Sequence, residues 1–184
     1  MSLSRDCKHF GTLGHMTWVL VGLGNPGVEY EHTRHNVGRE FLLACADTLP
    51  KKAEVLTPDT FMNKSGGAVK PYIKSAKAAE QLVVLHDDLD LPLGTVKISF
   101  GRGSAGHKGV ESVERAVKTK NYVRFRIGIS AGKKGGRVMK PDVLGKFKPS
   151  EAAELKKAKT SVKEGLEILM TEGLEKAMTS INGR

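Results

Sequence analysis

Apolar runs and segments of helical periodicity alternate along the chain from residue 17 onward. The runs at 17–22, 81–86 and 122–130 predict strands, and TVKISF at 95–100 alternates like a half-exposed strand. Apolar spacing predicts helices at about 36–49, 67–78 and 110–117. After Pro149 it predicts an amphipathic C-terminal helix that bends near Gly173. Strands that alternate with helices favour an α/β domain.

Length and composition predict one soluble domain. The chain has 184 residues, which suits one well-buried core, and its polar, patternless residues 1–16 predict a flexible tail before a domain at 17–184. No apolar run approaches the roughly 18 residues that span a bilayer. Cys7 and Cys45 lie far apart, so we expect neither a disulfide framework nor a zinc site, in a reducing compartment.

The charge balance points to a partner. Thirty lysines and arginines against twenty acidic residues give a formal net charge of +10. Such an excess favours a polyanionic partner, either nucleic acid or an anionic membrane surface. The alternative is that the charge serves only solubility.

The stretch VLVGLGNPG at 19–27 spaces its glycines as a dinucleotide-binding fingerprint does. That fingerprint also requires a packed helix directly after the glycines and an acidic residue about 20 positions later, at the end of a second strand. The residues after Gly27 are too polar and irregular for such a helix, and Asp47 lies inside a helical pattern. The turn therefore does not predict a dinucleotide cofactor.

Four polar side chains stand near the ends of predicted elements. Asn25 follows the first strand, His35 and Asn63 each precede a helix, and Asp87 directly follows the strand at 81–86. Open α/β sheets place their ligand crevice at the carboxyl ends of the strands, so we expect these side chains to share one crevice. The alternative is a turn asparagine and a surface histidine without a common site.

Five segments in a fixed order then decide the interpretation: GLGNPGVEYEHTRHNVG, TFMNKSGGAV, HDDLDLPLG, GSAGHKG and FRIGI. With them the chain resembles the bacterial-type peptidyl-tRNA hydrolase family from about residue 18 to the C-terminal helix. The resemblance implies a single α/β domain with a twisted mixed sheet flanked by helices. It also implies an enzyme of translation that cleaves the ester between a nascent peptide and the 3' ribose of a tRNA, with no cofactor and no metal.

The resemblance assigns roles to individual residues. His35 in TRHN matches the catalytic histidine, and Asp87 matches the carboxylate that orients it. Asn25 and Asn63 match the two asparagines that hold the substrate and the attacking water, Asn25 within the catalytic group. The substrate-lining positions match Tyr30, Phe61, His107 and Lys108, and the positions at the tRNA end match Lys97 and Arg126.

The chemistry of these residue types is consistent with ester hydrolysis. A neutral His35 can take a proton from water while Asp87 fixes the imidazole tautomer and stabilises the imidazolium, a general-base effect worth roughly 10² to 10⁴ in rate. Carboxamides such as Asn25 and Asn63 can hydrogen-bond a peptide backbone. A single aminoacyl group, with its free ammonium, offers fewer partners to such a site.

Three departures from the family pattern bear on these expectations. Lys108 replaces an asparagine, Ser99 replaces a common phosphate-binding lysine, and the short span between Leu49 and Thr60 predicts that a strand or hairpin is missing. They keep open a non-catalytic RNA-binding protein on the same fold. The glycine-rich loop 101–109 is a further candidate anion site or a flexible surface loop.

The expected partner is peptidyl-tRNA, met at its acceptor arm and its peptide backbone, and no membrane. We expect a monomer in the cytoplasm, with mitochondria as the alternative location. Salt should weaken tRNA binding strongly because binding releases counterions from the phosphates.

Overall fold

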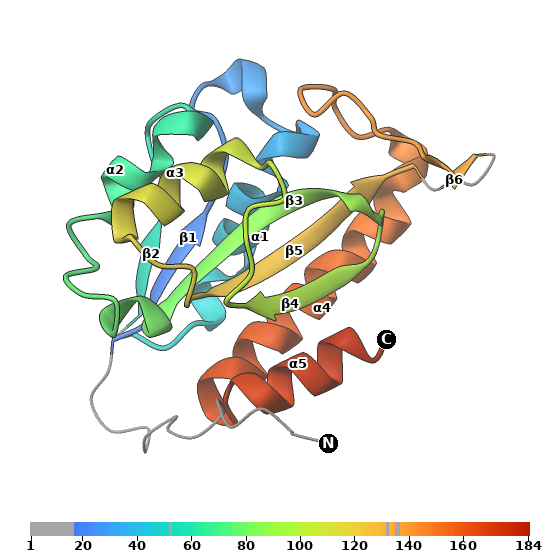
Figure 1. Ribbon diagram of the computed structural model, residues 1–184. Coiled ribbons are helices and arrows are strands. Elements are labelled where there is room, and N and C mark those ends of the chain that lie inside the picture. The colour runs from blue at the N-terminus through green and yellow to red at the C-terminus, as the bar shows by residue number, and fades with distance from the viewer. Residues whose placement is uncertain (1–16, 52, 132, 135–136) are drawn as a thin grey trace.

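A five-stranded sheet forms the centre of the computed structural model, which describes residues 17–51, 53–131, 133–134 and 137–184 (Figure 1). The strand order is β2-β1-β3-β5-β4, in which β4 alone runs antiparallel to its neighbour. The strands are β1 (Val19–Gly22), β2 (Glu54–Leu56), β3 (Leu82–Pro92), β4 (Val96–Phe100) and β5 (Val123–Ser130). A separate hairpin joins β6 (Lys133–Lys134) and β7 (Arg137–Val138). The predicted mixed sheet is confirmed, and the predicted tail at 1–16 lies outside the described residues.

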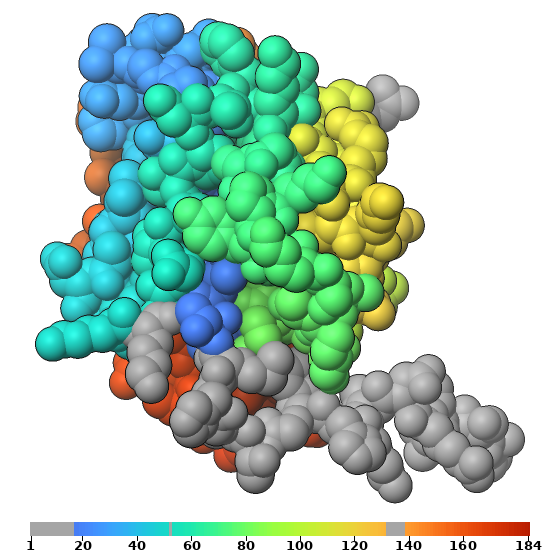
Figure 2. Space-filling view, turned by 90° about the vertical axis from the view of Figure 1, so that its left-hand side faces the viewer, coloured from blue at the N-terminus to red at the C-terminus, as the bar shows by residue number. Residues whose placement is uncertain are grey.

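Helices cover both faces of the sheet. One face carries α1 (Val37–Cys45), α4 (Ala152–Thr171) and α5 (Leu174–Asn182), and the other carries α2 (Ser65–Val69) and α3 (Lys108–Val117) (Figure 1). In the space-filling view the yellow residues of α3 lie at the right, and the orange and red C-terminal residues lie at the left and bottom (Figure 2). Short 3-10 turns lie at Val28–Tyr30, Arg34–Asn36, Ala46–Thr48, Met62–Lys64, Ala78–Gln81 and Pro149–Glu151. Among the described helices, none is both long and apolar enough to cross a membrane.

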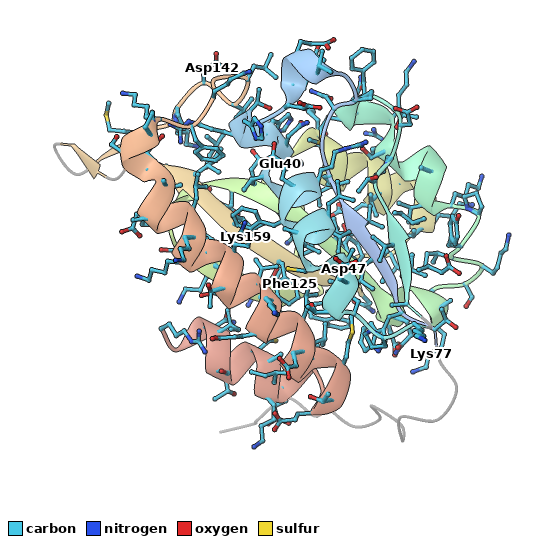
Figure 3. All side chains as sticks on the ribbon, turned by 180° about the vertical axis from the view of Figure 1, so that it is seen from behind. Glu40, Asp47, Lys77, Phe125, Asp142 and Lys159 are labelled. Carbon is cyan, nitrogen blue, oxygen red and sulfur yellow. The ribbon has the colours of Figure 1, made fainter. Side chains whose placement is uncertain are left out.

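Alternation along the strands creates two separate cores. In β1 the side chain of Leu20 packs with the α1 and α4 layer, whereas Val19 and Val21 pack with the α2 and α3 layer. Phe125 of β5 lies under α4, as the view from behind shows (Figure 3). A Cβ at Gly165 of α4 would stand 2.8 Å from the Phe125 ring, so only glycine lets the helix settle there. The predicted bend at Gly173, whose φ is 93°, separates α4 from α5.

Two predicted elements were wrong in extent. The helix expected at 67–78 spans Ser65–Val69 instead, because Pro71 lacks the backbone N–H that would continue the helical hydrogen bonds beyond Lys70. The strand expected at 81–86 continues to Pro92, because β5 pairs with it as far as Asp88 and again at Pro92. Asp87 therefore lies within β3 and not after it.

The two edges of the sheet are β2 and β4. The span 49–60 keeps a strand, β2, which pairs in parallel with β1. Strand β4 is more buried than its alternating pattern predicted, because α5 packs against it and the Asn182 side chain bonds both the N–H and the C=O of Ile98. The amide group of Asn182 thus satisfies part of the open edge of the sheet.

Candidate active site

His35 and Asp87, 52 positions apart, meet at the carboxyl end of the sheet. The Nδ1 atom of His35 lies 2.9 Å from Oδ1 of Asp87, whose side chain is 2% exposed. The close packing of α1 against β3 depends on a glycine, since a Cβ at Gly38 in α1 would clash with the Leu85 carbonyl oxygen of β3. Because Nδ1–H donates to the carboxylate, the Nε2 lone pair of His35 is left free to accept a proton.

A second imidazole binds the same carboxylate oxygen. The Nε2 atom of His107 lies 2.8 Å from Asp87 Oδ1, while its Nδ1 accepts from the backbone N–H groups of Gly109 and Val110 at 3.1 and 3.2 Å. These bonds assign the Nε2–H tautomer to His107. His107 thus both contacts the catalytic carboxylate and caps α3. The cap also occupies N–H groups that an anion would need at this helix N-terminus.

The electrostatics keep one negative charge at the centre. Burial alone would raise the pKa of Asp87, but its interactions with His107 and then with His35, which both donate hydrogen bonds to it, hold it well below its ordinary value. His86 is fully buried beside them, and burial, His107 and Arg124 hold its pKa well below 6.5. Its Nδ1–H donates to the Asp87 carbonyl at 2.7 Å, and Arg124 Nη1 approaches its Nε2 at 3.4 Å. His86 is therefore a neutral, structural neighbour of the pair.

Asn25 is held so that only its amide hydrogens are available. Asn36 Oδ1 accepts from the Asn25 backbone N–H at 2.8 Å, and Asn36 Nδ2 donates to the Asn25 carbonyl at 2.9 Å. The side-chain oxygen of Asn25 accepts from the N–H of Met62 at 2.8 Å. The Nδ2 group keeps no hydrogen bond within the described chain, so Asn25 can donate to a substrate.

The predicted substrate-lining residues form an exposed rim. Tyr30 and Phe61 make an edge-to-face contact with ring centres 6.3 Å apart, and Phe61 is 54% exposed. Asn63 is exposed in the 3-10 turn that begins at Met62, next to the backbone group that holds Asn25. A cavity of about 230 Å³ is lined by His35, Asp87, His107 and Lys108, whereas Asn25, Tyr30, Phe61 and Asn63 are not among its lining residues. Its other lining residues are His86, Asp88, Leu89, Asp90, Ser104, Ala105, Gly106, Lys140 and Val143.

The same cluster contains three side chains of the types that bind metal ions. Donor atoms of His35, Asp87 and His107 lie within 4.8 Å of one another, a spacing that a metal ion could use. In the present hydrogen-bond pattern both imidazole nitrogens that face Asp87 carry protons. A metal ion would have to displace both protons and cost α3 its cap, so the geometry fits a hydrogen-bonded triad better.

Comparisons with known proteins show the family of the chain. The family model for peptidyl-tRNA hydrolase matches residues 19–54 and 43–184. The chain belongs to the peptidyl-tRNA hydrolase family. Peptidyl-tRNA hydrolases from Syntrophotalea carbinolica and Geotalea daltonii are 35% and 36% identical, each over 90% of this chain and over 97% and 96% of their own lengths.

Solved structures give the same result for the fold. The crystal structure of peptidyl-tRNA hydrolase from Acinetobacter baumannii superposes with a TM-score of 0.78 at 31% identity, over 91% of this chain and 96% of that one. An endopeptidase from Escherichia coli shares only the fold, with a TM-score of 0.55 at 16% identity. Because proteins with different activities share this fold, the function has to be inferred from the site residues and not from the fold.

The structure places the two residues that depart from the family pattern, Lys108 and Ser99. Lys108 begins α3 at the mouth of the cavity, where its Nζ lies 3.2 Å from Glu111 and its side chain is 71% exposed. Ser99 is buried in β4 opposite Arg124, and its hydroxyl has no hydrogen-bond partner within the described chain. Neither side chain points a hydrogen bond at Asp87 or His35.

The two cations expected at the tRNA end are each engaged within the chain. Lys97 donates to the carbonyl groups of Asn182 and Arg184 at 2.6 and 3.2 Å. Arg126, its neighbour across β4 and β5, donates to Asp88 at 2.7 Å. Their role in tRNA binding stays a prediction.

Sequence reasoning missed Asn36 as a site residue and treated it only as the start of a helix. It stands at the N-cap of α1, yet its side chain makes no capping bond and holds the Asn25 backbone instead. The signal that could have found it is its place directly after His35 in the TRHN motif. A polar residue beside a catalytic candidate can serve the site while it occupies a cap position.

Proposed function

We propose that this protein hydrolyses the ester bond between a peptide and the 3' ribose of tRNA, with His35 as the general base. The observation that supports it most is the 2.9 Å contact between His35 Nδ1 and Asp87, which engages Nδ1 and makes Nε2 the nitrogen that can take a proton from water. Family membership supports the choice of substrate. The site residues support the chemistry.

The reaction needs one activated water and one stabilised oxyanion. His35 Nε2 takes a proton from a water as its oxygen attacks the ester carbonyl, and Asp87 stabilises the imidazolium that forms. Asn25 Nδ2 donates to the carbonyl oxygen as it gains negative charge. The intermediate then collapses, the bond to the ribose oxygen breaks, and that oxygen takes the proton from His35. The products are a tRNA with a free hydroxyl and a peptide carboxylic acid, which loses its proton to solvent.

The rate contributions expected of His35 and Asn25 are consistent with these two roles. General-base catalysis contributes roughly 10² to 10⁴ in rate, and one oxyanion donor contributes roughly 10² to 10³. An ester has a good leaving group, so the mechanism requires neither a covalent enzyme intermediate nor a cofactor.

Recognition of the peptide falls to the exposed rim. Asn63 offers a carboxamide, and the edge-to-face pair of Tyr30 and Phe61 offers an apolar wall. His107 acts on the substrate through Asp87, since its ring nitrogens are both engaged. Lys108 at the cavity mouth is free to swing toward a phosphate or a substrate carbonyl, because its exposed pairing with Glu111 is weak.

Binding of the tRNA rests on the net charge of +10 and on Lys97 and Arg126. Phosphates of the acceptor arm would compete with Asp88 for Arg126 and with backbone carbonyls for Lys97. The KM for tRNA substrates should therefore rise steeply with salt, while kcat changes little. We further propose that the protein acts as a monomer in the cytoplasm or in mitochondria.

The test uses a tRNA that carries an N-acetylated amino acid. Wild-type protein should release the acetylated amino acid well above the uncatalysed rate, and His35→Gln should lose most of that turnover. His32→Gln is the matched control, because His32 has a 75% exposed side chain and pairs with Glu40 away from Asp87. A wild-type protein that retains the tRNA without cleaving it would instead support the RNA-binding alternative.

A further inference from the structure

A buried ion pair stands directly behind the catalytic turn. Arg34 Nη2 donates to both carboxylate oxygens of Glu151 at 2.9 and 2.8 Å, and the two side chains are 7% and 16% exposed. The guanidinium lies 4.7 Å from the centre of the Phe147 ring and reaches the Ile129 carbonyl at 3.4 Å. Nothing in the proposed reaction uses these groups.

Glu151 also fixes the segment that precedes α4. Its Oε2 accepts from the backbone N–H of Lys148 at 2.7 Å. Burial alone would raise the pKa of the Glu151 carboxyl, but the Lys148 N–H and the Arg34 guanidinium lower it. The group is therefore a carboxylate at neutral pH and a full partner for Arg34.

The segment held by Glu151 lies along the catalytic turn. The His35 N–H donates to the Val143 carbonyl at 2.8 Å, and the Arg34 N–H donates to Gly145 at 3.0 Å. A β-bridge joins Thr33 to Lys146. Figure 1 shows this orange segment beside the blue turn, and Asp142 marks it in Figure 3.

The two halves of the catalytic pair are therefore supported differently. Asp87 belongs to β3, which is bonded on both sides within the sheet. His35 lies on a turn outside the sheet, and its backbone N–H is bonded to the segment that Glu151 secures. A catalytic group must be held within about 0.5 Å of its productive place by such supporting contacts.

We propose that Arg34 and Glu151 are positioning residues that hold the His35 imidazole in hydrogen-bonding register with Asp87. This inference rests on the proposed function and deepens it. The pair fixes the turn and the 143–147 segment to the start of α4 as one unit. Loss of the pair lets the turn shift and lengthens the contact between His35 and Asp87.

The experiment compares Glu151→Gln and Arg34→Lys with wild type on N-acetylated aminoacyl-tRNA. Each variant should lower kcat by roughly 10-fold or more, since a misplacement of about 1 Å can cost about 10²-fold, and should leave KM within about twofold. The matched controls are Glu164→Gln and Arg184→Lys, because this pair is about half exposed and remote from His35. Both controls should keep kcat and KM.

A double-mutant cycle separates positioning from general support of the fold. If the clamp acts through the contact between His35 and Asp87, Glu151→Gln should lower kcat far less in an Asp87→Asn background than in wild type. Additive effects would overturn the proposal, as would a wild-type kcat for Glu151→Gln. Thermal melts identify loss of folded protein, and a kcat that is normal per folded molecule would also overturn it. Failure of the proposed function is distinct, because wild-type protein would then show no turnover.

Discussion

The charge of Asp87 is the most informative group to remove. Asp87→Asn preserves the shape of the side chain, and because both imidazoles donate to one oxygen, Oδ1, the amide can keep its carbonyl oxygen toward them. What disappears is the negative charge that faces the imidazolium formed in the reaction. Two unit charges about 4 Å apart attract by about 4 kcal/mol at an effective dielectric constant near 20. At about 1.4 kcal/mol per tenfold in rate, kcat should fall roughly 10³-fold.

The assay is steady-state release of the acetylated amino acid from tRNA, with kcat and KM determined separately. KM should stay within about twofold, because Asp87 is buried and does not touch tRNA in the proposed mechanism. Asp88→Asn is the matched control, since that neighbouring carboxylate contacts Arg126 and the Asp90 N–H and contacts neither His35 nor His107. A variant at position 87 that keeps more than a third of the wild-type kcat, or that loses only affinity, would refute the reasoning.

Three further predictions follow from individual contacts. His107→Ala removes the cap of α3 and one donor to Asp87, and should lower the free energy of unfolding by about 2 kcal/mol in urea titrations; a loss below about 0.5 kcal/mol would contradict this. Burial depresses the pKa of His86 in the folded state, so the buried ring stays neutral while the unfolded ring gains a proton below its pKa near 6.5. The stability that this group supports is therefore present above pH 6.5 and is lost as the pH falls below it. Between pH 6.5 and about 5.5 wild type should therefore lose about 1 kcal/mol more stability than His86→Gln, and parallel pH profiles would argue against it. Lys108→Asn should keep or raise turnover, whereas a collapse in kcat would show that the lysine has its own task.

Much of the fold and the central pair could be predicted from the sequence. The buried runs that became β1, β3 and β5 are apolar enough to identify a sheet, and strand ends in such sheets gather polar side chains at one edge. That rule and the family motifs together predict that His35 and Asp87 share one site. The bend at Gly173 was also predicted, since glycine readily adopts the positive φ found there.

The supporting contacts could not be predicted, because they depend on directions of backbone groups. One ring nitrogen of His107 faces Asp87 and the other accepts from N–H groups of α3. To predict these contacts, one would need to know at which residue that helix begins. Glu151 lies 117 positions from Arg34, and no local pattern links them. Asp87 was placed after a strand because polarity suggested an end, whereas β5 extends the pairing through it. Tertiary packing decided each of these points.

The most direct measurement is single-turnover cleavage of N-acetylated aminoacyl-tRNA by His35→Ala, with tRNA binding followed in the same samples. The account predicts wild-type affinity and a cleavage rate at least 10²-fold lower, because the imidazole transfers the proton between the attacking water and the leaving oxygen and does not bind the tRNA. Cleavage at the wild-type rate with normal binding would show that another group activates the water.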